Sequence, residues 1–127
     1  MSEQQICVLL VEDDRSVRRY LEVTLQRAGY KVITAEDGLA GMKCALTDGV
    51  DVVLTDAIMP QMSGRELARF LKNTPKLAKL PIVLLTGQEA HQPGSVDEKF
   101  IDAVLYKPVK AAELKKCLAS VLALSAQ

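Results

Sequence analysis

Five polar residues of this chain each follow or end a short apolar run, where a strand would give way to a loop. They are Glu12, Asp13, Asp56, Thr86 and Lys107. A carboxylate at the end of a strand is held by rigid backbone and still faces solvent, which suits a reactive group. Asp56 is the leading candidate, because the apolar run 52–54 before it gives way to a loop that contains Pro60 and Gly64.

Each of these residues also has a plain structural interpretation. Asp56 taken alone would be a turn residue that closes a strand. The acids after the first run could cap a helix, and for Asp14 we adopt this interpretation. Lys107 could be a surface charge at a strand end, and Thr86 could cap the next loop. The choice between structure and chemistry depends on whether the fold brings the five residues together.

The apolar pattern predicts the elements that must position them. Short continuous apolar runs indicate strands buried on both faces. We expect strands at residues 6–11, 31–35, 51–56, 82–85 and 103–106. Apolar residues at helical spacing predict the connecting helices. They are expected at residues 17–28, at 39–46, after Gly64 as far as Pro75, from the capping motif at Ser95, and through residues 114–122.

Five strands alternating with five helical segments predict an α/β fold. It is a doubly wound, five-stranded parallel sheet of the flavodoxin-like kind, with helices on both faces. The usual strand order for this size is 2-1-3-4-5, with right-handed crossovers. Ligands then bind at the carboxyl ends of the strands, beside the switch point between the first and third strands. We treat residues 1–127 as a single domain.

This topology would gather the candidate residues in one cleft. Three carboxylates, from Glu12, Asp13 and Asp56, would repel by roughly 1–4 kcal/mol per pair at contact distance. A hard divalent cation relieves that repulsion, and Mg²⁺ favours a few carboxylates together with water and phosphate oxygens. The sequence therefore predicts a Mg²⁺ site, with Thr86 and Lys107 beside it.

Composition narrows the setting of the chain. Lys and Arg together number 16, as do Asp and Glu, so no net field favours nucleic acid or an anionic membrane. No run is long enough to span a membrane, and the first residues do not form a signal peptide. The three cysteines, Cys7, Cys44 and Cys117, stand in apolar segments and suggest reduced core thiols. We expect a cytoplasmic protein that does not bind nucleic acid directly.

Four motifs connect the chain to a known family. They are Val-Glu-Asp-Asp (11–14), Leu-Thr-Asp-Ala-Ile-Met-Pro-Gln-Met-Ser-Gly (54–64), Leu-Leu-Thr-Gly (84–87) and Lys-Pro (107–108). With them the chain resembles, over nearly its whole length, the receiver domains of bacterial two-component response regulators. This resemblance implies that Asp56 accepts a phosphoryl group from the phosphohistidine of a sensor histidine kinase or a histidine phosphotransfer protein.

The resemblance also implies the remaining roles. Mg²⁺ would be held by Glu12, Asp13, Asp56 and the backbone carbonyl of Ile58. A receiver of this kind is a switch and not an enzyme, catalysing only its own phosphoryl transfer and autodephosphorylation. Phosphorylation would shift the face formed by the helix expected from Ser95, the fifth strand and the last helix, and so control an output protein or domain that the sequence does not identify.

Elementary chemistry agrees with this assignment. Phosphoryl transfer needs an in-line nucleophile and neutralisation of three equatorial oxygens. Mg²⁺ would take one oxygen, the ammonium of Lys107 another, and the hydroxyl of Thr86 with nearby N–H groups the third. Lysine acts on phosphate as a point charge. The Lys107–Pro108 bond is a candidate cis peptide.

The chain departs from the family pattern in three places. An aromatic residue is usual three positions before the lysine, where this chain has Val104; Tyr106, on the same strand face, is a possible substitute. The segment 88–94 suggests a short or irregular fourth helix. Ser63 stands where an Asp is common, and we interpret it as a tolerated turn change. The apolar Ile58, two positions after Asp56, predicts a phospho-aspartate that is not especially short-lived.

Three other functions were weighed. Phosphatases of the haloacid dehalogenase type need a second Asp two residues after the first. This chain has Ile58 at that position, which argues against this class. A flavodoxin-like flavin carrier would need a phosphate loop where Glu12 and Asp13 stand, and these acids repel phosphate. A pseudo-receiver, an interaction module that is never phosphorylated, is the strongest rival, although it would usually have lost Asp56, Lys107 or one of the paired acids.

Overall fold

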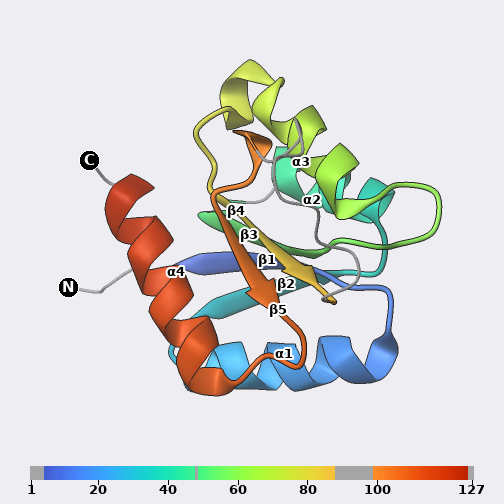
Figure 1. Ribbon diagram of the computed structural model, residues 1–127. Coiled ribbons are helices and arrows are strands. Elements are labelled where there is room, and N and C mark those ends of the chain that lie inside the picture. Colours follow the sequence, from blue (N-terminus) through green and yellow to red (C-terminus); the bar gives the residue numbers. More distant parts are fainter. Residues whose placement is uncertain (1–4, 48, 88–98, 126–127) are drawn as a thin grey trace.

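A sheet of five parallel strands forms the centre of the molecule (Figure 1). The computed structural model describes residues 5–47, 49–87 and 99–125. The strands are β1 (Cys7–Val11), β2 (Lys31–Ala35), β3 (Val52–Asp56), β4 (Ile82–Thr86) and β5 (Ala103–Tyr106). Their order is β2-β1-β3-β4-β5, all parallel, which confirms the predicted sheet and its strand order.

Helices cover both faces of this sheet. They are α1 (Arg15–Arg27), α2 (Gly38–Thr47), α3 (Gly64–Lys72) and α4 (Ala111–Ser125), with a short 3₁₀ turn at Pro75–Leu77 after α3. The helices α1 and α4 pack on one face, and α2 and α3 pack on the other (Figure 1). The helix predicted from Ser95 lies outside the described residues and stays a prediction.

Alternating side chains of the central strands build two separate cores. In β1, Val8 and Leu10 pack with α1 and α4, whereas Leu9 and Val11 pack with α2 and α3. The strands β1, β3 and β4 are buried along their whole length, as expected for apolar runs with a helix layer on each side. Slipping such a strand by one residue would exchange its two faces. The positions just beyond the strand ends are therefore firmly held.

Helix ends follow the capping side chains. Asp14 caps α1, because its Oδ1 accepts the N–H of Val17 at 2.9 Å; the interpretation of Asp14 as a cap is confirmed. Gly29, after α1, has a φ of +100°, a conformation that glycine adopts readily, and the helix ends before it. Ser63 is more than a tolerated turn residue. Its hydroxyl accepts the N–H of Glu66 and its own N–H donates to the Glu66 carboxylate, which forms a capping box for α3.

Two sequence expectations about the chain's setting can be compared with the structure. Within the described ranges, no helix combines the length and the apolar character needed to cross a membrane. The cysteines Cys7, Cys44 and Cys117 form no disulfide, and burial raises the pKa of the Cys117 thiol. A raised pKa keeps that thiol protonated and unreactive, as expected for a core position.

Gly64 lets the loop after β3 fold back tightly against the sheet. Its N–H donates to the carbonyl of Ala57 at 2.9 Å. A Cβ at this position would collide with the backbone carbonyl of Asp56 and come within 2.9 Å of the Leu84 side chain. Because the main obstacle is backbone, no change of rotamer relieves it.

We expect Gly64→Ala to lower the free energy of unfolding by about 1–3 kcal/mol, the usual cost of overpacking. Urea unfolding followed by circular dichroism measures this. Gly49→Ala is the matched control, because an added Cβ there meets nothing within 4 Å. Equal effects of the two substitutions would show that the close approach of Gly64 to Asp56 does not limit stability.

Candidate functional site

Three acidic side chains meet where β1 and β3 end. These strands are neighbours in the sheet, and Val11 of β1 pairs with Thr55 of β3. Glu12 and Asp13 follow β1 directly, and Asp56 is the last residue of β3. One carboxylate oxygen from each of the three acids lies within 4.8 Å of the others. The predicted meeting of these acids is confirmed.

Lys107 reaches the acids from the loop after β5. Its Nζ donates a hydrogen bond to Asp56 Oδ1 at 2.8 Å and lies 3.2 Å from Glu12 Oε1. The Lys107–Pro108 peptide is cis, as predicted. The Asp56 side chain is 10% exposed and that of Glu12 is fully buried, so water and salt screen these charges less than they screen surface pairs. The ammonium thus offsets part of the acids' mutual repulsion.

Glu12 is the buried member of the acid cluster. Its Oε2 accepts the N–H of Asp14 at 3.1 Å. Its Oε1 accepts no hydrogen bond from any described residue, because the contact with Lys107 is an ion pair without hydrogen-bond geometry. A buried carboxylate oxygen in that position costs free energy until it gains a further ligand.

Burial and the neighbouring charges shift the pKa values of Glu12 and Lys107. Burial raises the pKa of Glu12, and the carboxylate of Asp56 adds to the rise; the N–H of Asp14 and the charge of Lys107 oppose it. For Lys107, burial alone would lower the pKa, but its hydrogen bond to Asp56 and its charge attraction to Glu12 and Asp56 outweigh that effect and raise it. At neutral pH Lys107 therefore stays a cation.

The donor set fits a hard divalent cation. Such ions prefer carboxylate oxygens, and Mg²⁺ typically takes a few of them together with water. Glu12, Asp13 and Asp56 supply one oxygen each within a span that a single ion could share. The buried Oε1 of Glu12 also lacks a hydrogen bond that a cation would replace. The residues present could therefore hold a metal ion.

Thr86 ends β4 on the other side of β3. The register pairs Asp56 with Leu85, so Thr86 lies one residue beyond Asp56 on the neighbouring strand. The Thr86 hydroxyl donates to the carbonyl of Gly87 at 3.0 Å and not to the acids. Glu12, Asp13, Asp56 and Lys107 are thus brought into one cluster. Thr86 lies beside this cluster, but its hydroxyl bonds to the loop after β4.

Two apolar or aromatic positions flank the site. Ile58 is 66% exposed, and a haloacid dehalogenase phosphatase would need a carboxylate there. Tyr106 of β5 pairs with Thr86 in the sheet and is 41% exposed, whereas Val104 pairs with Leu84 and is partly buried. The aromatic ring nearest to Thr86 along β5 is therefore that of Tyr106. The role of the Ile58 carbonyl as a ligand stays a prediction.

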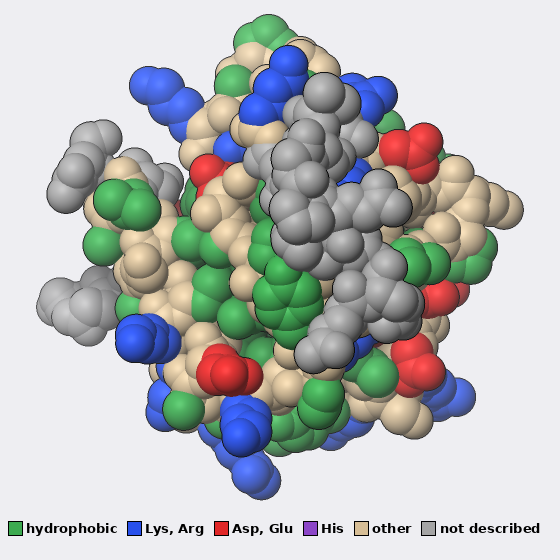
Figure 2. Space-filling view, in the orientation of Figure 1, with side chains coloured by type: hydrophobic (Ala, Val, Ile, Leu, Met, Phe, Trp, Pro, Cys, Tyr) green, Lys and Arg blue, Asp and Glu red, His purple; other side chains and the backbone are tan. Residues whose placement is uncertain are grey.

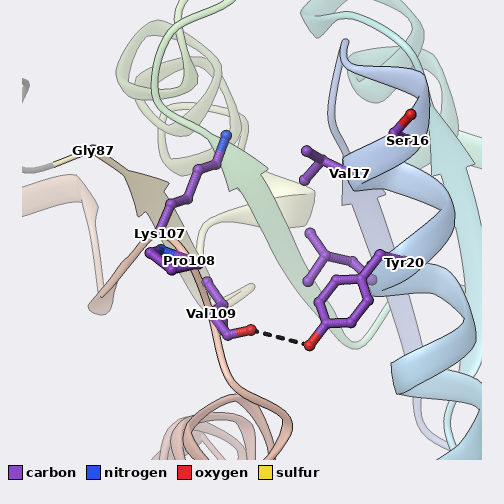
Figure 3. A pocket seen from close by; sticks show the side chains of 8 residues that line it. Ser16, Val17, Tyr20, Gly87, Lys107, Pro108 and Val109 are labelled. Carbon is purple, nitrogen blue, oxygen red and sulfur yellow. Dashed lines mark hydrogen bonds between the residues drawn. The ribbon is translucent and has the colours of Figure 1, made fainter.

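The helix α1 supplies two contacts that sequence reasoning did not identify. Arg18 Nη1 donates to the carbonyl of Glu12 at 2.8 Å. The hydroxyl of Tyr20 donates to the carbonyl of Val109 at 3.2 Å, as drawn in Figure 3. The sequence contains no signal for the acceptor of either side chain. Both acceptors are backbone groups of other segments, which no local pattern reveals.

A comparison with known families identifies the family to which this chain belongs. The sequence model of the response regulator receiver domain family matches residues 8–119 and so spans all the candidate residues. The chain belongs to this family. It is a receiver domain of the kind found in two-component response regulators, as the resemblance implied, and its acid cluster occupies the carboxyl edge of the family's sheet.

Curated relatives and solved structures agree with that membership. The transcriptional regulatory protein AfsQ1 of Streptomyces coelicolor is 34% identical over 116 residues, 91% of this chain and 50% of AfsQ1. The chain spans half or less of the first curated relatives that it matches. The chemotaxis protein CheY4 of Vibrio cholerae has a TM-score of 0.86 at 32% identity, covering 93% of this chain and 99% of CheY4. TrrA of Thermotoga maritima, solved in complex with Mg²⁺-BeF, has a TM-score of 0.84 at 29% identity, covering 92% and 99%.

We expect Lys107→Ala to tighten divalent-cation binding by about fivefold or more, because removing one positive charge leaves the acids with more repulsion for the ion to relieve. Calorimetric titration with Mg²⁺ measures the change. Lys110→Ala is the matched control, since Lys110 is an exposed lysine three residues further along. Unchanged or weaker binding in Lys107→Ala would contradict this account of the cluster's charge balance.

Proposed function

We propose that this chain is a phosphoacceptor switch in which Asp56 takes a phosphoryl group from a phosphohistidine. The observation that supports this most is the 2.8 Å ion pair between Lys107 and Asp56, next to the two other acids. An ammonium beside a carboxylate nucleophile is placed to neutralise an oxygen of the incoming phosphoryl group. The position of this ion pair depends on strands that are packed on both faces, so the site needs little reorganisation when the phosphoryl group arrives.

The transfer step follows from the roles of these side chains. Lys107 is bonded to Oδ1 of Asp56, so we assign the attack on phosphorus to the other oxygen of that carboxylate. The new O–P bond forms as the P–N bond to the donor imidazole breaks, and the electron pair of that bond stays with the imidazole, which takes up a proton. Throughout the transfer, the ammonium of Lys107 neutralises negative charge on a phosphoryl oxygen.

Mg²⁺ is the cation that we assign to the acid cluster. Glu12, Asp13 and Asp56, with the carbonyl of Ile58, would hold it, and when bound it supplies positive charge to the phosphoryl oxygens. Glu12 contributes a buried oxygen that accepts no hydrogen bond from the described residues. Asp13 contributes an exposed carboxylate at the mouth of the site.

We assign to Thr86 the coupling between the phosphoryl group and the rest of the domain. To bind a phosphoryl oxygen its hydroxyl must leave the carbonyl of Gly87, and that exchange would move the loop after β4. The affected face would include the helix predicted from Ser95, β5 and α4. Figure 2 shows hydrophobic side chains gathered over β5 and beside α4, where Tyr106 and Leu124 are 41% and 68% exposed. Phosphorylation would shift the populations of two arrangements of this face.

The partners follow from the same chemistry. The phosphoryl donor would be a sensor histidine kinase or a histidine phosphotransfer protein, and the shifted face would act on an output protein or domain. We propose no nucleic-acid contact for the receiver domain itself, which we take to be residues 1–127, because its positive and negative charges are equal at 16 each. We place it in the cytoplasm, where its cysteines would stay reduced. Its catalysis would be confined to its own phosphorylation and dephosphorylation.

Phosphorylation of Asp56 separates this proposal from a pseudo-receiver. With Mg²⁺ and phosphoramidate, wild type should gain one phosphoryl group by intact-mass spectrometry, whereas Asp56→Asn should gain none because it lacks the nucleophile. Asp14→Asn is the control, because Asn is as good a helix cap as Asp and the change removes a neighbouring charge. Labelling of Asp56→Asn equal to wild type, or no labelling of wild type, would sink the proposed function.

The lifetime of the phosphorylated state tests the role of Ile58. We expect Ile58→Asn to shorten the half-life of phospho-Asp56 several-fold, because a polar group there can orient a hydrolytic water. Loss of the phosphoryl group after removal of the donor, followed by mass spectrometry, gives the rate. Leu39→Asn is the matched control: an apolar side chain that is 54% exposed, in α2 and outside the face that phosphorylation would shift. No change in Ile58→Asn would count against this explanation of the lifetime.

A further inference from the structure

One hydrogen bond joins α1 to the segment that carries Lys107, across a cavity. The cavity has a volume of about 720 Å³ and lies between α1 and the segment 107–109 (Figure 3). Tyr20 of α1 extends over it, and its hydroxyl donates to the carbonyl of Val109 at 3.2 Å. Residues 20 and 109 are 89 positions apart in the chain, so this bond ties the first helix to the loop after β5.

The same helix also holds the loop that carries the acids. Arg18 donates to the carbonyl of Glu12 at 2.8 Å, two residues before Tyr20 in the sequence of α1. Glu12 and Lys107 are in turn an ion pair at 3.2 Å. The helix α1 therefore binds the backbone on both sides of that pair, and a rigid helix is a suitable part to set the separation of two loops.

The segment 107–109 has few other supports on this side. Lys107 and Pro108 face the cavity, whose walls also include Val17 and Leu21 of α1. Pro108 has no N–H to donate. The N–H of Lys107 donates to the carbonyl of Thr86 at 2.9 Å, away from α1. The Val109 side chain is buried in the core that α1 and α4 form with the sheet, which leaves its carbonyl to be held by a hydrogen bond. Among the described residues, the hydroxyl of Tyr20 thus supplies the hydrogen bond that ties the backbone of this segment to α1.

We propose that Tyr20 is a positioning residue for Lys107: its hydroxyl holds the backbone at Val109 so that the ammonium stays over Asp56 and Glu12. This inference rests on the proposed function of Asp56 and Lys107. Removing the hydroxyl loosens the lysine from the acids. Two effects of opposite sign follow. Phosphorylation slows, because the ammonium is less often in place, and Mg²⁺ binds more tightly, because the acids lose part of their compensating charge.

Tyr20→Phe tests this, since it removes the hydroxyl and keeps the ring. We expect labelling of Asp56 by phosphoramidate to slow by about three- to tenfold, the range for loss of one hydrogen bond. Mg²⁺ affinity, from calorimetric titration, should rise by about twofold. General loosening of the site would slow labelling and weaken Mg²⁺ binding together, and that result would overturn the proposal. Tyr30→Phe, at the opposite edge of the sheet, is the matched control and should change neither quantity.

A double-mutant cycle shows whether the hydroxyl acts through the lysine. In a Lys107→Ala background, Tyr20→Phe should leave Mg²⁺ affinity unchanged; an effect equal to that in wild type would overturn the proposal. Thermal melting of each variant checks that it is folded. The Mg²⁺ cycle does not need phosphorylation, so failure of wild type to gain a phosphoryl group would remove the proposed function, while the cycle would still decide whether Tyr20 positions Lys107.

Discussion

The ammonium of Lys107 placed between two buried or nearly buried carboxylates is the interaction on which the site depends. It lies 2.8 Å from Asp56 and 3.2 Å from Glu12, while Asp13 adds a third acid within the same 4.8 Å span. Without that cation the acids would repel one another in surroundings that water screens poorly. With it, the cluster keeps a net negative charge, which suits binding of a metal ion, and still presents one positive charge to a phosphoryl group.

The rest of the fold can be understood as the support for this arrangement. The strands β1, β3 and β4 are buried on both faces, so a slip of one residue would move every side chain into the opposite core. Gly64 allows the loop after Asp56 to turn back where any Cβ would strike the strand. The helix α1 adds bonds to the backbone on either side of the Glu12–Lys107 pair. Rigid strands set the coarse positions, and single hydrogen bonds refine them.

One departure of this chain from its family pattern, Val104, lies on β5 at the edge of the sheet. Val104 is partly buried in β5, and the aromatic side chain beside Thr86 is Tyr106, half exposed on the same strand face. Thr86 itself is buried and bonded to its own loop. Movement of a buried hydroxyl with an exposed ring as its neighbour would alter the surface of β5 directly. The acid cluster and Lys107 keep the residue types of the family pattern, and we propose that Tyr106, in place of position 104, supplies the aromatic side chain on the route from the site to the surface.

Most of the fold could be predicted from the sequence because it depends on local patterns. Short apolar runs located all five strands. The alternation of strands with helical segments implied parallel pairing, and the usual topology of a sheet of this size gave the strand order. The identity of Glu12, Asp13, Asp56 and Lys107 as one group followed from their common place at strand ends. The capping box at Ser63 was also visible in the sequence, as Ser63 and Glu66 three residues apart. The comparison with the family pattern led instead to the interpretation of Ser63 as a turn residue.

The sequence by itself determined which side chains reach the carboxyl edge of the sheet and what chemistry their types allow. Only the tertiary structure decided how they engage one another: that Lys107 bonds Asp56 more closely than Glu12, that Thr86 turns to Gly87, and that Tyr20 reaches Val109 across a cavity. The physical reason is range. Strand and helix patterns repeat every two to four residues and can be read along the chain, whereas these contacts join segments whose separation is set by the packing of both cores.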